Sequence, residues 1–427
     1  MIDNLVNRYK SFFLSSNNLF KNAYYLLTTG LLSSIAGYLF WIVAAGYYSV
    51  EIIAQVGVLM SITGFLIALG DMGYGIAAIR FLPALNNKKS KHFIFMVLLM
   101  NFALTSLWYF LSIALFDFFG RYEFLFNGQV LLVLYLFVTM QGLLYAWGSC
   151  FTGLRRNELS LYQEVIVHFG KLLFLVLIAQ YALTLDSLIL GGALAMILAN
   201  TFAFVRLIYL QIEGPNESEL TLFDRHVMVY AAKNFFGRFA LDSHQYIVPI
   251  LAYAVLDPGD AGIFYICWIC GLAFRIVPSA CLNSLFAKLS EVNPAMKKLV
   301  WNALILNFTI LFSGMLFLIV FGQYVLGLFG EIYQEYNSLV VVIGLAAVPW
   351  TINYFVVTLC RVRNSSGSIN LIGLSLLITT SLLVPYFGGL FGMYGIAVAY
   401  LAAQIVALFL VLTFLKLTKS RLLHFSE

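Results

Sequence analysis

Apolar runs long enough to cross a membrane follow one another along almost the whole 427-residue chain. A helix needs roughly 20 mainly apolar residues to span about 30 Å of hydrocarbon. Only 10% of the residues are charged and 62% are hydrophobic, whereas soluble domains carry about 25% charged residues. The sequence therefore predicts an all-α polytopic membrane protein with twelve transmembrane helices, at approximately 22–47, 54–79, 93–116, 128–151, 159–182, 187–210, 229–255, 261–286, 299–321, 336–359, 369–387 and 393–415.

Basic residues are distributed unevenly over the predicted loops. The amino end, the even-numbered loops and the carboxyl end hold nineteen of the 24 Lys and Arg residues, and the odd-numbered loops hold only Arg121. Lys and Arg of short loops are retained on the cytoplasmic side of a membrane. The asymmetry predicts that both termini are cytoplasmic.

The longest loop divides the chain into two halves of six spans each. We expect an amphipathic amino-terminal segment at 1–21, an N-lobe at 22–210, a cytoplasmic linker at 211–226, a C-lobe at 227–416 and a cytoplasmic tail at 417–427. The halves carry a faint repeat, because 44–69 aligns without gaps with 251–276 at an offset of 207 and Gly64 then matches Gly271. Two such halves that start on the same side would be parallel repeats, as in some transporters.

A polar stripe runs along the fifth predicted span. Glu164, His168 and Lys171 follow one another at i, i+4 and i+7, which places them on one face of a helix. A charge exposed to lipid costs at least about 2.5 kcal/mol, so this face is expected to line a wet cavity or to satisfy itself. In the first case Lys171 attracts an anionic substrate, while Glu164 and His168 change protonation.

The seventh and eighth spans also carry charges. Arg238 and Asp242 belong to a second polar stripe, and Lys233 lies nearer the helix end, where a lysine can also snorkel to the headgroups. Arg275 lies about a dozen residues from either end of its span. At that depth it must be paired or face water, which makes it the strongest single candidate for an anion contact.

The second span ends in "GDMGYG", where Asp71 stands among three glycines. Glycines lower helix propensity and let a neighbouring backbone approach closely. Asp71 is expected to cap or pair locally at a hinge, or else to couple ion movement to transport. Pro278 aligns with Asp71 at the offset of 207 and would disturb the matching helix, which favours the hinge.

The sequence contains no pattern typical of an enzyme. It has no P-loop, metal-ligand cluster or nucleophile elbow, and the predicted external loops are only about 4 to 14 residues long. The five cysteines lie in or beside predicted helices, and the "CWIC" pair has no partner ligands, so packing is the better interpretation. We expect no catalytic residues, no cofactor and no metal site, and no interaction with nucleic acid.

Two stretches resemble a known family. "GYYSVEIIAQVGVLMSITGFLIALGDMGYGIAAIRFLPAL" and "FALDSHQYIVPILAYAVLDPGDAGIFYICWICGLAF" are similar to the repeated helix pair of the Wzx-type polysaccharide transport flippases. These proteins form a branch of the multidrug/oligosaccharidyl-lipid/polysaccharide (MOP) exporter superfamily. The resemblance implies two six-helix lobes in a V around a central cavity, in a bacterial inner membrane.

The resemblance also implies a function. A flippase of this kind carries an undecaprenyl-diphosphate-linked oligosaccharide, such as an O-antigen unit, to the outer leaflet by alternating access. Its partners would be membrane lipids, H⁺ or Na⁺ as coupling ion, and a polysaccharide polymerase with its chain-length regulator. The expected substrate-binding residues are Arg275, Lys171, Arg238 and Lys233, and the expected ion-coupling residues are Glu164, His168, Asp242 and Asp71.

Two other functions remain open at this point. A multidrug antiporter of the same superfamily exchanges organic cations for ions and would favour an acidic pocket, whereas the charged residues within the spans sum to +1. A membrane enzyme, such as a glycan polymerase or glycosyltransferase, generally exposes a long catalytic loop. The short loops argue against the enzyme.

Overall fold

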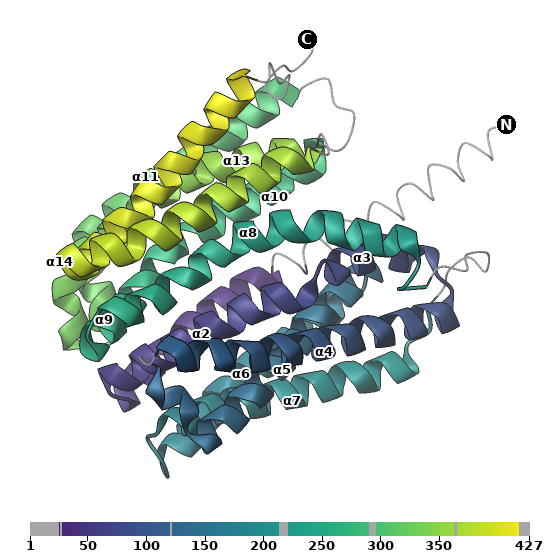
Figure 1. Ribbon diagram of the computed structural model, residues 1–427, viewed down its shortest axis with the longest axis horizontal. Coiled ribbons are helices and arrows are strands. Elements are labelled where there is room, and N and C mark those ends of the chain that lie inside the picture. Colours follow the sequence, from purple (N-terminus) through teal and green to yellow (C-terminus); the bar gives the residue numbers. More distant parts are fainter. Residues whose placement is uncertain are drawn as a thin grey trace.

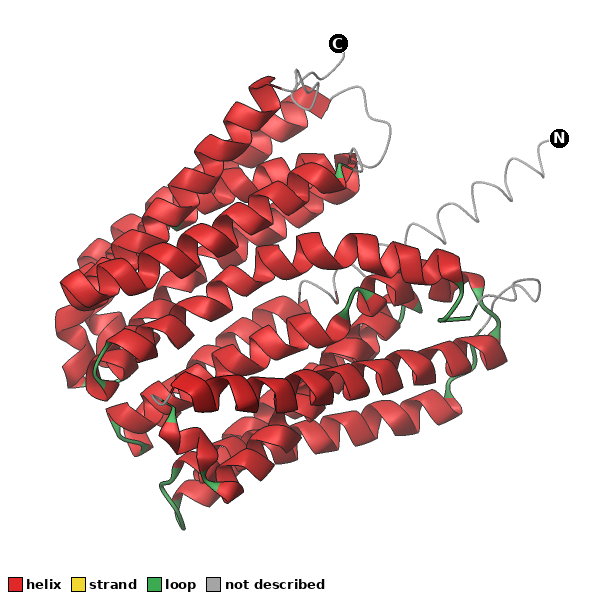
Figure 2. Cartoon of the chain, viewed as in Figure 1, coloured by secondary structure: helices red, strands yellow, loops and turns green. Residues whose placement is uncertain are grey.

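The protein is a bundle of helices arranged in two groups. The computed structural model describes residues 25, 28–119, 122–212, 221–289, 296–362 and 365–417, and every regular element in these ranges is a helix (Figure 2). The first group contains an amino-terminal helix Thr28–Tyr47, α2 (Val50–Asp71), α3 (Tyr74–Phe81), η1 (Leu82–Ala84), α4 (Asn87–Phe119), η2 (Glu123–Phe126), α5 (Gly128–Gly153), α6 (Asn157–Ala179) and α7 (Leu185–Tyr209). The second group contains α8 (Arg225–Val255), α9 (Pro258–Leu272), η3 (Ala273–Arg275), α10 (Ile276–Leu289), α11 (Met296–Gly327), η4 (Glu331–Tyr336), α12 (Asn337–Leu345), α13 (Ala347–Val362) and α14 (Ser366–Leu417).

The two groups are inclined to each other. Figure 1 shows their ribbons converging where α2 and α9 begin and spreading apart toward the carboxyl end of α14. At the converging end the backbone of Gly262 in α9 approaches Val50 of α2 so closely that a Cβ would collide with its carbonyl oxygen. We call this end the turn end, and the opposite end, where α7 ends and α8 begins, the linker end. The predicted V of two lobes is confirmed.

Twelve spans are present in the described residues, as predicted, although two of them are not separate, strongly apolar helices. Ten helices are long and apolar enough to cross a membrane by themselves. The eleventh, α8, has 31 residues but carries Lys233, Arg238 and Asp242, which lower its hydropathy. The twelfth arises because α14 is two helices joined by a sharp turn.

The turn in α14 is made at Gly392, whose φ of 61° and ψ of −143° are not helical. A Cβ on Gly388 would lie 2.8 Å from Cγ1 of Ile396. Residues eight apart are about 12 Å apart along a straight helix, so the chain must reverse here. The two antiparallel arms correspond to the predicted spans at 369–387 and 393–415.

The second predicted span, 54–79, is interrupted where the sequence places its glycines. α2 ends at Asp71, Met72 and Gly73 are left-handed with φ of 41° and 82°, and α3 starts at Tyr74. In the second half the break is the 3₁₀ turn Ala273–Arg275, which aligns with 66–68 rather than with 71. Both halves are therefore broken near one place, but not at the aligned residue.

The amino-terminal helix bridges the two groups. The Tyr38 hydroxyl donates a hydrogen bond to the carbonyl oxygen of Ile269 in α9, at 2.8 Å, and Trp41 packs edge-on against Tyr265 at 4.9 Å between ring centroids. The predicted segment 1–21, residues 213–220 of the predicted linker and residues 418–427 of the predicted tail lie outside the described residues.

Glycine at 392 should be required for the hairpin. We expect Gly392→Ala to destabilise the second group by about 1 to 3 kcal/mol, because a side chain is strained at this φ and ψ. The change should lower the apparent unfolding temperature of the purified protein in detergent. Gly389→Ala is the matched control, since that position has open space around it and no positive φ. Equal stability of the two variants would contradict the assignment of the turn.

Candidate functional site

A polar cavity of about 320 Å³ lies where α2, α5, α6 and α8 meet. It is therefore enclosed by helices of the first group together with the helix that begins the second. Polar and aromatic side chains alternate with small apolar ones around it. The lining residues are Met60, Thr63, Gly64, Ile67, Ala68, Asp71, Gly73, Phe137, Gln141, Tyr145, Lys171, Phe235, Arg238, Phe239, Asp242 and Tyr246.

The break after α2 shapes one wall of this cavity. Asp71 is only 5% exposed, and its Oδ1 accepts a hydrogen bond of 2.9 Å from the backbone N–H of Gly75 in the first turn of α3. The carboxylate therefore caps the helix that follows, which agrees with the predicted local capping by Asp71. Gly73 approaches α8 so closely that a Cβ would collide with the carbonyl oxygen of Ala231. Only glycine satisfies both this contact and the φ of 82°.

Two cations reach the cavity from different helices. Arg238 and Asp242 are one turn apart on α8, with Nε and Oδ2 separated by 3.6 Å, and the Arg238 guanidinium lies 5.3 Å from the ring centroid of Tyr145. Lys171 enters from α6, with its Nζ 5.8 Å from the ring centroid of Phe137. Cation–π contacts of this kind hold basic groups in place without neutralising them.

The charges that line the cavity are formally balanced. Asp71 and Asp242 face the cavity together with Lys171 and Arg238, so the slight positive excess expected from all charges within the spans does not hold for this lining. The cations suit an anionic group, and the carboxylates can take up a cation or a proton. The aromatic rings, two of them tyrosines, offer flat faces and hydroxyl groups to a sugar.

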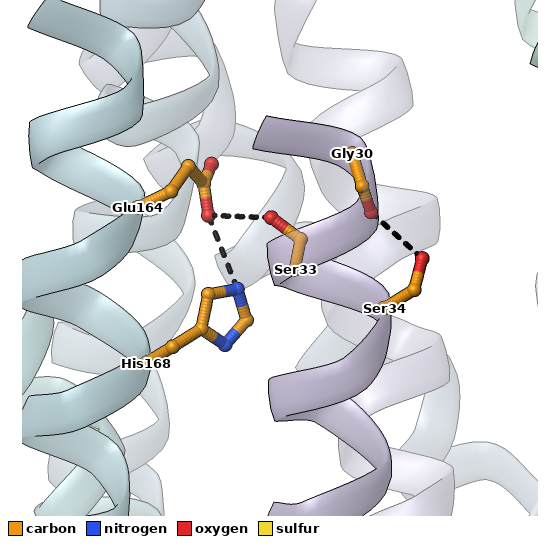
Figure 3. Close-up of polar contacts among 5 residues, drawn as sticks. All are labelled: Gly30, Ser33, Ser34, Glu164 and His168. Atoms are coloured by element: carbon orange, nitrogen blue, oxygen red, sulfur yellow. Dashed lines mark hydrogen bonds and ion pairs between the residues drawn. The ribbon is translucent and has the colours of Figure 1, made fainter. Parts of the chain in front are cut away.

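Glu164 and His168 lie outside this lining. His168 Nε2 is 3.2 Å from Glu164 Oε2, and the same oxygen accepts a hydrogen bond of 3.2 Å from the Ser33 hydroxyl (Figure 3). Figure 3 shows both side chains of α6 pointing toward the amino-terminal helix. The predicted stripe is therefore divided, since Lys171 reaches the cavity while the other two residues satisfy each other and Ser33.

Arg275 and Lys233 are also placed elsewhere. Lys233 is exposed near the start of α8 and is not a lining residue. Arg275 is 7% exposed and lies within the second group, 5.0 Å from the ring centroids of both Trp350 and Tyr400. Of the eight predicted site residues, the structure brings together Asp71, Lys171, Arg238 and Asp242.

The sequence interpretation overlooked several uncharged members of the site. Gln141 and Tyr145 are one turn apart on α5, and Tyr246 is one turn beyond Asp242 on α8. A search limited to charged residues passes over them. The available signal was the spacing of i and i+4 between polar groups in the middle of an apolar span.

No group of three or more His, Cys, Asp or Glu side chains suited to a metal ion occurs within the described part of the chain. The five cysteines, all of which lie in the described residues, form no disulfide with one another, and four of them are buried. The lining offers ionic and hydrogen-bonding groups to a ligand rather than a nucleophile activated by a base.

Solved structures of low sequence identity share the fold. A mutant of the Vibrio cholerae MATE transporter VcmN has a TM-score of 0.66 and 16% identity, over 95% of this chain and 98% of that one. The lipid II flippase MurJ in an inward closed conformation has a TM-score of 0.65 and 17% identity, over 92% and 87%. A MOP superfamily transporter from Pyrococcus furiosus has a TM-score of 0.64 and 11% identity, over 95% and 97%.

Sequence comparison identifies the family. No curated protein matches the chain. The model of a family described as "Polysaccharide biosynthesis protein" matches residues 19–267, which is more than half of the sequence and includes every helix that lines the cavity. The protein is therefore a multi-pass membrane protein of the polysaccharide biosynthesis family, the MOP-type flippase family that its sequence resembles.

Proposed function

We propose that the protein is a flippase that carries a polyprenyl-diphosphate-linked oligosaccharide, an O-antigen unit or another surface glycan, from the cytoplasmic to the outer leaflet. The observation that carries this proposal is the cavity holding Lys171 and Arg238 inside an apolar bundle of a polysaccharide biosynthesis family. A diphosphate is an anion that needs cations once it leaves water. The prenyl chain needs no such site, because it can remain in the lipid.

The cavity also suits the sugar next to the diphosphate. Gln141 and Tyr145 provide hydrogen-bonding groups on α5, and Tyr246 provides another on α8. The rings of Phe235 and Phe239 add apolar surface. A cavity of about 320 Å³ holds part of an oligosaccharide, so the remaining sugars would extend toward the opening between the lobes.

The carboxylates of the cavity favour a second function, the exchange of an organic cation for H⁺ or Na⁺. Asp71 and Asp242 would be the residues that bind such a cation. Transport of an organic cation against its gradient, lost in Asp242→Asn, together with no movement of a lipid-linked glycan, would support this function over the flippase.

We further propose that protons couple to transport at the cavity. Asp242 is 3.6 Å from Arg238, and two unit charges about 4 Å apart interact by about 1 kcal/mol in water and about 4 kcal/mol at an effective dielectric of about 20. Protonation of Asp242 would free Arg238 for an anion, and its ionisation would compete with that anion. Asp71 is a second candidate in the same lining, and Glu164 with His168 forms a third where α6 contacts the amino-terminal helix through Ser33.

The same proposal includes location and partners. We propose a bacterial inner membrane with both termini in the cytoplasm and the lobes open toward the cytoplasm, and the excess of Lys and Arg at the linker end supports this orientation. A polymerase and its chain-length regulator would consume the glycan on the outer side and so draw the transport forward.

The proposed orientation predicts a pattern of chemical labelling. Single cysteines introduced at 123–127 and 257–260 should react with a membrane-impermeant maleimide applied to intact cells, and those at 86–91 should react only after permeabilisation. A chain without its own five cysteines serves as the background. Labelling of 86–91 in intact cells would reverse the proposed orientation.

Removing either cation of the cavity should slow transport of the glycan. We expect Lys171→Ala and Arg238→Ala each to reduce transport of a polyprenyl-diphosphate oligosaccharide into proteoliposomes by about tenfold or more, since hydrogen bonds to charged groups contribute about 1.5 to 3 kcal/mol. Arg206→Ala is the control, because Arg206 also lies over a ring, 5.5 Å from that of Phe202, but does not line the cavity. Unaltered rates in both cavity variants would remove the cavity from the mechanism.

Proton coupling predicts a difference between two conservative variants. A pH gradient imposed on proteoliposomes should accelerate transport by the wild type and by Glu164→Gln, whereas Asp242→Asn should be indifferent to it. The reason is that, of these two carboxylates, Asp242 lines the cavity beside Arg238 and Glu164 does not. If Glu164→Gln alone lost its response, the coupling would lie at the contact between α6 and the amino-terminal helix. A wild-type rate that ignores the gradient would support passive equilibration.

A further inference from the structure

A second polar cluster is buried within the second group, apart from the cavity. Arg275 of η3 lies between α13 and the second arm of α14, where its guanidinium carbon is 5.0 Å from the ring centroids of Trp350 and Tyr400. Arg275 is 7% exposed and Tyr400 is fully buried. Neither residue contributes to the cavity lining.

The hydrogen-bonding groups of this cluster are incompletely satisfied. Nη1 and Nη2 of Arg275 and the hydroxyl of Tyr400 are enclosed, and none of the three atoms has a hydrogen-bond partner in the described part of the chain. The guanidinium stays charged inside proteins and presents its N–H donors in a fixed plane. The two rings can stabilise the charge, but they do not replace hydrogen bonds in that plane.

The neighbouring side chains supply no negative charge. His244 stacks on Tyr400 at 6.1 Å between ring centroids, and its Nε2 is 3.2 Å from Nε2 of Gln404. An amide nitrogen only donates, so this ring nitrogen accepts and the imidazole is neutral. Asn353 donates to the carbonyl oxygen of Gln404 at 2.9 Å. No carboxylate pairs with Arg275 among the described residues, because their ion pairs are Arg156–Glu158, His168–Glu164 and Arg238–Asp242.

The internal repeat relates this cluster to the cavity by sequence alignment. Arg275 aligns at the offset of 207 with Ala68, which lines the cavity of the first group. The second group thus carries, at the matching position, a cation where the first has a methyl group. The atoms around Arg275 are enclosed, so a diphosphate bearing sugars does not fit, whereas a single small ion needs little space.

We propose that Arg275 and Tyr400 bind one small inorganic anion, of which chloride is the simplest, within the second group. The anion supplies the negative charge that the described protein atoms lack and accepts hydrogen bonds from the guanidinium and the phenol. It joins η3, α13 and the second arm of α14 around one charge. The site does not depend on the proposed flippase activity.

Direct binding of radiolabelled chloride to the purified full-length protein in detergent tests this site. Ionic strength is held constant with sodium gluconate, whose anion is too large to enter. We expect saturable binding of one chloride per chain. Affinity should fall at least tenfold in Arg275→Met and about threefold to tenfold in Tyr400→Phe, which keeps the ring and removes only the hydroxyl. Arg206→Met, on α7, should bind chloride as the wild type does.

The apparent unfolding temperature provides a second test, because chloride should raise it in the wild type but not in Arg275→Met. Replacing gluconate by chloride should raise the apparent unfolding temperature of the wild type, because a ligand that binds only the folded state stabilises it. Arg275→Met should show no such rise, and in gluconate it should be at least as stable as the wild type, because a buried charge without its partner has been removed. Absence of saturable chloride binding by the folded wild type would overturn the proposal, as would unchanged binding by Arg275→Met.

Discussion

The cost of placing charge and polar backbone in hydrocarbon controls this structure, and α8 is where that cost is greatest. Lys233, Arg238 and Asp242 make it less apolar than the other long helices. The helix can nevertheless cross the hydrocarbon because it packs along α2 on one side and along the first arm of α14 on the other. Its charged face then opens on the cavity rather than on lipid, so one polar helix both joins the two groups and supplies half of the charges of the site.

Close backbone contacts keep α8 against the first group at the linker end. The left-handed Gly73 lets α3 approach Ala231, and Arg80 lies over the ring of Tyr230 at 4.5 Å. Farther along, the ring of Tyr246 covers Gly64, and Phe65 packs against Phe239 at 5.4 Å between ring centroids. The cavity is therefore bounded by a seam between the lobes that is built from small residues and rings. In the proposed alternating access, movement of the lobes would have to open this seam and would expose the paired charges in turn to either side.

Most of the architecture was predictable from sequence, because span length and Lys and Arg bias are local properties that hydrocarbon imposes directly. Twelve spans, two halves and the weak point after Asp71 all followed from such patterns. The cavity was predictable only in part. Helical periodicity placed Glu164, His168 and Lys171 on one face of α6. One face of a helix is wide enough to contact two neighbouring helices, so Glu164 and His168 face the amino-terminal helix, where Ser33 donates a hydrogen bond to Glu164. Depth in the span predicted that Arg275 would be paired or face water, but depth alone could not say that the second lobe would enclose it between two rings. The break in the second half was misplaced because Pro278 can lie in the first turn of α10, where its missing N–H costs nothing.

Buried charge is compensated in opposite ways in the cavity and in the cluster around Arg275. In the cavity each cation has a carboxylate within the same lining, so the site is nearly neutral when empty and an incoming anion must displace a partner that is already present. For the proposed substrate, such a site would bind a multivalent anion weakly enough to release it and would respond to protonation. Around Arg275 the described residues offer rings and amides but no carboxylate, so a compensating ion there would be held by enclosure rather than by exchange. The first arrangement would suit the proposed substrate, which passes through, and the second would suit the proposed anion, which stays and holds η3, α13 and the second arm of α14 together.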